Sequence, residues 1–174
     1  FLPEAGEAEL LAIRRTELLA DIDYEKIDYV VISYGLNDYT SGKVLYGENV
    51  YDETTYAGAL RMSIEQIMKI CPNAKIILSS ITYCVCYANG ELESDGYSKN
   101  WGGGYINEYR DAMEQVASEY ENVYFQDNLE KLGIDESNFN EYLRDDMHFN
   151  SEGQKLYAEC LTDFINEVER ESNE

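Results

Sequence analysis

Continuous apolar runs and helically spaced apolar positions alternate along this chain. Three runs predict strands buried on both faces, namely YVVISY within residues 28–34, IILSSI within 74–83 and VYF within 122–127. Between the runs, apolar residues recur every three or four positions and predict helices over residues 4–20, 53–71, 105–120 and 151–169. The Gly- and Tyr-rich stretch 87–104 is expected to form a long loop.

Local signals support the helix boundaries. One apolar stripe of the second helix comprises Tyr56, Leu60, Ile64, Ile67, Met68 and Cys71. Pro72-Asn73 should end that helix, and Asn150-Ser151 should begin the last one with Ser151 as its cap.

Helices that alternate with continuous apolar strands are typical of α/β proteins. In that class, right-handed crossovers join parallel strands and helices cover both faces of the sheet. At 174 residues the chain is long enough for one domain with a real core and too short for two ordinary ones. We therefore expect residues 1–174 to form a single α/β domain.

The charge limits the classes of partner. A formal net charge of -22 weighs against nucleic acids and anionic membrane surfaces, because both would repel the protein. The apolar runs are far too short to cross a bilayer, so we expect a soluble protein. No signal peptide is visible at the start of the sequence, and cytoplasmic and secreted locations both stay open.

The cysteines indicate thiols rather than disulfides or a metal centre. Cys71, Cys84, Cys86 and Cys160 show no CxxC spacing, and a bridge between Cys84 and Cys86 would be strained. We expect free, mostly buried thiols. One histidine and scattered cysteines do not make a four-ligand zinc set, so neither a metal nor a cofactor is expected.

Candidate chemistry lies at two places. GLND, residues 35–38, follows the first predicted strand, and the only histidine, His148, lies three residues after Asp145 in RDDMHFN. In parallel sheets, functional groups gather at the carboxyl ends of the strands. Taken alone, GLND contains ordinary turn residues and His148 could be a surface residue at a helix start, so each motif is weak without the other.

The two motifs together resemble the SGNH hydrolases, also called GDSL esterases and lipases. GLND follows a YVVISY strand, and Asp-x-x-His stands about a hundred residues later, just before the last helix. The linking segment CPNAKIILSSITY also looks like the family's fourth-strand region, and the similarity extends from about Glu7 to Phe164. The resemblance implies a three-layer α/β/α flavodoxin-like fold around a parallel sheet, with the first strand or strands absent from this chain.

The resemblance also implies roles for individual residues. Asp145 and His148 correspond to the family's catalytic aspartate and histidine, whereas Asn37 and Gly35 correspond to the oxyanion-hole asparagine and the glycine before it. The chemistry fits: a histidine can accept a serine proton and return it to the leaving alcohol, and a carboxylate orients its ring. An amide such as Asn37 can donate to the oxyanion. We interpret Asp146, the alternative carboxylate, as a solvated loop acid.

The sequence departs from the family at the nucleophile. No Gly-Asp-Ser turn and no GxSxG elbow occurs, and Ser33, Ser79, Ser80 and Ser151 are poor substitutes because they lie within predicted strands or at a helix cap. Gly6 is a weak candidate for the family's second oxyanion glycine. We expect an esterase whose serine is missing from this chain. The alternatives are a non-catalytic SGNH-like binding module and, with less support, a flavodoxin-like ligand-binding domain.

The substrate is less constrained. The segment from Tyr83 to Tyr105 follows a strand's carboxyl end and contains the only tryptophan, Trp101. Aromatic residues such as Trp101 and Tyr105 could stack on a sugar ring, which favours small acyl esters, with acetyl groups on carbohydrate as one candidate. Equally, Trp101 could simply pin a glycine-rich loop in a chain that is rich in tyrosine.

The absence of the serine-bearing strand predicts that another segment covers the first strand. In the family's strand order, 2-1-3-4-5, the strand that carries the serine lies beside residues 28–34. Without it, YVVISY would be an apolar edge that soluble proteins normally cover. We therefore expect this edge to be covered by an N-terminal segment or by a second copy of the chain.

Overall fold

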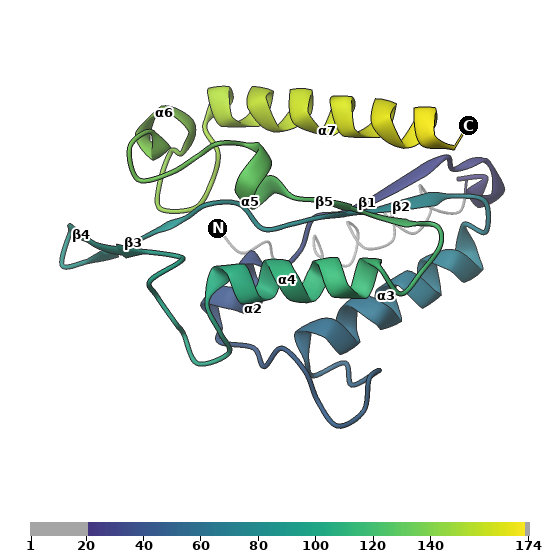
Figure 1. The fold of residues 1–174 in the computed structure, drawn as a ribbon, viewed down its shortest axis with the longest axis horizontal. Coiled ribbons are helices and arrows are strands. Elements are labelled where there is room, and N and C mark those ends of the chain that lie inside the picture. Colours follow the sequence, from purple (N-terminus) through teal and green to yellow (C-terminus); the bar gives the residue numbers. More distant parts are fainter. Residues whose placement is uncertain (1–20, 173–174) are drawn as a thin grey trace, which may run out of the picture.

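The computed structural model describes residues 21–172, in which a three-stranded parallel sheet lies between helices and a separate hairpin projects at one end (Figure 1). The sheet has the order β1-β2-β5, with bounds Tyr29–Ile32, Lys75–Ser79 and Val123–Gln126. Both ladders are parallel. The α/β class and the three strands expected from the apolar runs are confirmed.

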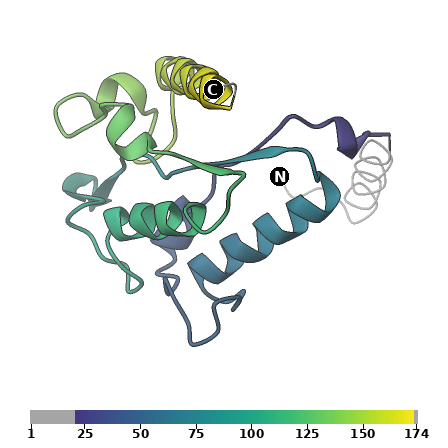
Figure 2. The same ribbon diagram turned by 45° about the vertical axis from the view of Figure 1, so that its right-hand side comes forward.

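Three long helices cover the sheet. α3 (Tyr56–Ile70) and α4 (Ile106–Ala117) lie on one side of it, and α7 (Ser151–Glu171) lies along the other (Figures 1 and 2). Their ends differ from the predicted ends by at most three residues. Four short helical elements were not predicted: η1 (Tyr24–Lys26), α2 (Leu36–Thr40), α5 (Asn128–Lys131) and α6 (Phe139–Tyr142). The helix expected over residues 4–20 lies outside the described residues.

A β-hairpin replaces the first part of the expected loop over residues 87–104. β3 (Val85–Ala88) pairs antiparallel with β4 (Glu91–Asp95). Asn89 and Gly90 connect the two strands with positive φ angles of 55° and 84°. An Asn-Gly pair favours such a turn, so the sequence did contain a signal for this hairpin.

The central strand is buried, but the outer strand β1 is not. Ile76, Ile77 and Leu78 of β2 have no exposed surface, as expected for a strand covered on both faces. In β1, Ile32 is 4% exposed whereas Val31 is 38% exposed. The expectation that β1 is buried on both faces is therefore wrong for the described part of the chain. Within that part, β1 is the end of the sheet and pairs only with β2.

A buried polar cluster joins the ends of β2 and β5 to α7. The Asn128 amide nitrogen donates to Ser79 Oγ at 2.7 Å and to the Ser80 carbonyl at 2.6 Å. Its backbone N–H donates to Ser80 Oγ at 2.8 Å, and Ser79 Oγ lies 3.0 Å from the Tyr157 hydroxyl. Asn128 is 1% exposed, so these bonds form away from water and hold the carboxyl ends of two strands together.

Replacing Asn128 should therefore cost considerable stability. We expect Asn128→Ala to lower the free energy of unfolding by about 2–4 kcal/mol, because it removes two side-chain hydrogen bonds and leaves buried acceptors without a donor. Urea unfolding would measure this change. The exposed Asn166→Ala serves as the control and should stay within about 0.5 kcal/mol of the parent. Equal effects of the two substitutions would contradict a stabilising role for the cluster.

Candidate active site

The only histidine lies in a closed loop between α6 and α7. Leu143 and Phe149 form an isolated antiparallel bridge, and the Arg144 N–H donates to the His148 carbonyl at 2.8 Å. These contacts close a tight turn around residues 144–148. The turn is tied to the hairpin as well, because the Val85 N–H donates to the Asp146 carbonyl at 2.9 Å.

The Asp145 carboxylate fixes both the turn and the imidazole ring. Its Oδ1 accepts the backbone N–H groups of Met147 at 3.0 Å and His148 at 2.7 Å. His148 Nδ1 lies 3.0 Å from both carboxylate oxygens. With Asp145 holding Nδ1, the opposite ring nitrogen, Nε2, forms no hydrogen bond with a described residue and can accept a proton from a reacting group. The predicted pair is thus in direct contact.

The same bonds hold Asp145 in its charged form. The backbone N–H groups of Met147 and His148, followed by the His148 ring, lower the pKa of Asp145 to about 2. A carboxylate bonded in this way stays ionised throughout the neutral pH range and can stabilise an imidazolium. The side chains are open to solvent, with 41% of Asp145 and 57% of His148 exposed.

Asn150, rather than Ser151, caps the helix that follows His148. Its Oδ1 accepts the N–H groups of Glu152 at 2.9 Å and Gly153 at 3.0 Å. Its amide nitrogen donates to the Glu141 carbonyl at 2.9 Å. The predicted cap at Ser151 is therefore wrong by one residue. The Asn150 side chain bonds to both sides of the turn and so holds the turn against α7.

Gly35 and Asn37 occupy the turn from β1 into α2. Gly35 has a φ of 122°, and a Cβ atom there would lie 2.5 Å from Ile81 Cγ2 and 2.7 Å from the Tyr56 hydroxyl. Only glycine fits this conformation and this space. Asn37 follows in the first turn of α2, is exposed, and its side-chain amide donates no hydrogen bond to a described residue. It can therefore donate to a ligand.

The two motifs lie at the same edge of the sheet. α2, the hairpin and the turn before α7 all lie at the end where β1, β2 and β5 terminate (Figure 1). Gly35 packs against Ile81, which follows β2, and Val85 a few residues later bonds to the Asp146 carbonyl. A short continuous set of contacts therefore connects the Asn37 turn to the His148 turn.

The predicted substrate aromatics lie in the loop beyond the hairpin. Trp101 is 45% exposed and Lys99 Nζ stands 4.9 Å from its ring centre. Tyr105 is 42% exposed and precedes α4. The Tyr39 hydroxyl from α2 donates to the Lys99 carbonyl at 2.7 Å, which holds this loop against the helix that carries Asn37.

No serine hydroxyl is hydrogen-bonded to His148 in residues 21–172, which contain every serine of the sequence. Ser79 and Ser80 are buried in the Asn128 cluster, and Ser33 follows β1 on the exposed side. No group of His, Cys, Asp and Glu in the described part is arranged to hold a metal ion. The four cysteines are free thiols, as predicted.

Tyr56 lies in the site region, although nothing in the sequence indicated a role for it there. The Tyr56 hydroxyl is buried without a hydrogen-bond partner and borders a cavity of about 190 Å³ beside Tyr34, Asp38 and Lys43. Asp38 and Lys43 form an ion pair at 3.2 Å. In the sequence, Tyr56 belongs to the apolar stripe of α3 and so could not be told from a core residue.

The sequence matches the GDSL-like lipase/acylhydrolase family over residues 5–156, most of its length, and the chain therefore belongs to that family. A search of curated proteins found no match. No helix in residues 21–172 has the length and apolar character needed to span a membrane.

Solved structures share the fold. One structure aligns with a TM-score of 0.73 at 23% identity, over 87% of this chain and 69% of its own. A protein from Lactobacillus plantarum gives 0.71 at 22% identity, over 87% and 71%. A possible lipase from Chitinophaga pinensis gives 0.65 at 17% identity, over 87% and 77%. A salicylyl-acyltransferase from a tetracycline biosynthetic pathway gives 0.60 at 16% identity, over 83% and 39%.

The Gly35 turn can be tested by substitution. We expect Gly35→Ala to lower the free energy of unfolding by about 2–5 kcal/mol, because the new methyl group adds overlap to an unfavourable φ. Gly90→Ala is the matched control: its φ is also positive, but no atom lies within 4 Å of the added carbon. It should cost about 1–2 kcal/mol. Urea unfolding measures both, and equal losses would contradict the packing role of Gly35.

The Asp145 bonds predict an unusual titration. In carbon-detected NMR, the Asp145 carboxyl should titrate near a pKa of about 2. Because the pKa of Asp145 is lower in the folded state than its ordinary value, ionised Asp145 stabilises the folded protein above about pH 4. This stabilisation is lost as pH falls toward 2. In His148→Ala the pKa of Asp145 should stay well below its ordinary value, because the backbone N–H groups of residues 147 and 148 are the largest cause of the lowering. A return to the ordinary value in that variant would show that the ring is the main cause.

Proposed function

We propose that this chain supplies the base, the orienting acid and an oxyanion donor of a serine esterase that hydrolyses small acyl esters. The observation that carries the proposal is the Asp145–His148 pair, in which the carboxylate holds Nδ1 at 3.0 Å and Nε2 forms no hydrogen bond with a described residue. Asn37, with an unused amide at the same edge of the sheet, supports it. Family membership supports acyl hydrolysis as the class of reaction.

In the proposed reaction, Nε2 of His148 takes the proton of a serine hydroxyl as its oxygen bonds to the ester carbonyl carbon. The carbonyl oxygen becomes an oxyanion and accepts a hydrogen bond from the Asn37 amide. The bond to the alcohol then breaks, and the alcohol leaves with the proton from His148. Water repeats the two steps on the acyl-serine, which releases the acid and restores the serine. Asp145 stabilises the imidazolium in each half.

The serine is proposed to come from a segment that these 174 residues do not include. The side of β1 that pairs with no described strand would receive it, since Val31 is 38% and Tyr34 is 63% exposed. The cavity next to Tyr34 holds the unpartnered Tyr56 hydroxyl, which could bond to the backbone of an added strand. Such a segment would come from the same protein or from a second copy of it.

Small esters, with acetyl groups on carbohydrate as one candidate, suit the surface near Asn37. Trp101 and Tyr105 offer exposed aromatic area on the loop that the Tyr39 hydroxyl holds beside α2. Aromatic faces stack on the apolar face of a sugar ring. The net charge of -22 weighs against substrates presented on anionic membranes.

The proposal predicts that the 174-residue chain alone lacks the nucleophile. It should hydrolyse p-nitrophenyl acetate no faster than its His148→Ala variant, and a fluorophosphonate probe should label none of its serines. By contrast, protein expressed from the complete coding sequence should be active. There, His148→Ala should lower kcat/KM by at least about 10³-fold, and Asn37→Ala should lower it by about 10²–10³-fold.

Three outcomes would redirect this assignment. Stoichiometric labelling of a serine within residues 1–174 would show that the nucleophile is already present. An inactive full-length protein that binds acylated sugars would favour a non-catalytic binding module. Full activity of the Asp145→Ala and His148→Ala variants of the full-length protein would remove the proposed pair from the mechanism.

A further inference from the structure

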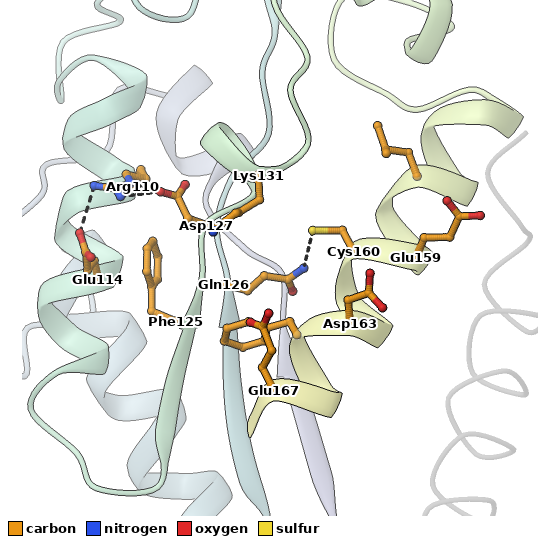
Figure 3. A pocket seen from close by; sticks show the side chains of 12 residues that line it. Arg110, Glu114, Phe125, Gln126, Asp127, Lys131, Glu159, Cys160, Asp163 and Glu167 are labelled. Carbon is orange, nitrogen blue, oxygen red and sulfur yellow. Dashed lines mark hydrogen bonds and ion pairs between the residues drawn. The ribbon is translucent and has the colours of Figure 1, made fainter. Parts of the chain in front are cut away.

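A large groove lies between α4, β5 and α7, and none of the candidate catalytic residues lines it (Figure 3). It has a volume of about 660 Å³, which is within the usual size of small-molecule sites. Phe125 points from β5 to the α4 side of the groove, and Gln126 points to the α7 side. The open edge of β5 therefore forms its floor.

The floor presents a buried acceptor without a partner. Gln126 is 1% exposed, and its amide nitrogen lies 3.6 Å from Cys160 Sγ on α7. Its carbonyl oxygen, Oε1, forms no hydrogen bond with any residue in the described part of the chain. Buried carbonyl groups are normally bonded, so an unpartnered one that lines a cavity points to a ligand with an N–H or O–H donor.

One wall of the groove carries excess negative charge. Glu159, Asp163 and Glu167 are exposed, follow one another at four-residue spacing along α7 and form no ion pair with a described residue. On a helix this spacing puts successive carboxylates about 6 Å apart. Across the groove, Arg110 contacts Asp127 at 3.0 Å and Glu114 at 3.0 Å, and Lys131 adds a second positive charge. The lining as a whole therefore holds five carboxylates against two cations.

A second stripe of α7 is apolar. Leu156, Cys160 and Phe164 are half-buried, have the same four-residue spacing and line the groove beside the carboxylates. Facing them, the Phe125 ring is covered by Arg110 at 5.4 Å on the α4 side. The groove thus combines a row of carboxylates with a parallel row of apolar side chains.

We propose that this groove binds a linear aliphatic polyamine. Ammonium groups separated by three or four methylenes lie about 5–6 Å apart, which matches the carboxylate spacing set by one turn of helix. The methylenes would pack on Leu156 and Phe164, and one N–H would donate to Gln126 Oε1. This site is independent of the proposed esterase activity, because it shares no residue with the Asp145–His148 pair.

Titration calorimetry with spermidine tests the proposal on the 174-residue chain. We expect saturable binding of one molecule per chain, with a dissociation constant below about 1 mM. Asp163→Asn combined with Glu167→Gln should weaken it by about 5–10-fold. The matched control, Glu91→Gln with Glu121→Gln, removes the same charge from exposed carboxylates outside the groove and off α7, and it should change affinity less than about 2-fold.

Cys160 gives a second readout that does not depend on charge. It is half-buried in the groove while the other three cysteines are buried, so iodoacetamide should modify it first. Saturating spermidine should slow that modification, whereas ethylenediamine, whose ammonium groups are too close to reach successive carboxylates, should not. Gln126→Leu should weaken spermidine binding in protein that unfolds at the parent's temperature or, if that variant is unstable, Phe164→Ala should do so.

The opposite results would overturn the proposal. Equal losses in the groove variant and the control variant would mean that spermidine is only a diffuse counterion of a chain with net charge -22. Absence of saturable binding, or unchanged alkylation of Cys160 at saturation, would show that no polyamine occupies the groove.

Discussion

The parallel pairing of β2 with β1 on one side and β5 on the other determines where each candidate residue lies. Parallel strands all end at one edge, so the turns that follow them must share that edge. The turn after β1 carries Asn37, and the segment after β2 contacts the His148 turn through Val85. Asn128, two residues after the end of β5, forms the buried polar cluster with Ser79. Residues separated by more than a hundred positions therefore lie at one end of the molecule.

The Asp145 carboxylate performs two tasks at that edge. It accepts two backbone N–H groups of its own turn, and it also contacts the ring of His148. The bonds that fold the turn are thus the bonds that keep the acid charged. A substitution that removes only the charge would also loosen the turn, so loss of activity at Asp145 should be interpreted together with the stability of the variant.

Much of this arrangement could be predicted from the sequence because long periodic segments determine it. The runs around Val30 and Ile77 and the stripe of α3 gave the strands and a covering helix. Short elements were missed: α2, α5 and α6 span only four or five residues, too few to show a period. The hairpin was missed because its strands hold exposed residues such as Tyr87, although Asn89-Gly90 is a turn signal.

Contacts between distant residues were beyond the reach of the sequence. Nothing in the stripe of α3 distinguishes Tyr56, with its unpartnered hydroxyl, from a core tyrosine. The predicted cap was Ser151, whereas Asn150 caps α7 and also donates to the Glu141 carbonyl, a contact that only the folded turn brings about. The resemblance to a known family identified Asp145 and His148, whereas their 3.0 Å contact came from the structure.

The single tryptophan gives the molecule an internal optical reporter. Trp101 is the only indole in the chain, it is 45% exposed, and a lysine ammonium stands over its ring. Fluorescence excited at the red edge of the indole band therefore arises from one loop, the loop that the Tyr39 hydroxyl holds beside the helix of Asn37. A ligand that binds to this loop would shift the emission maximum of Trp101 and change its quenching without any added label.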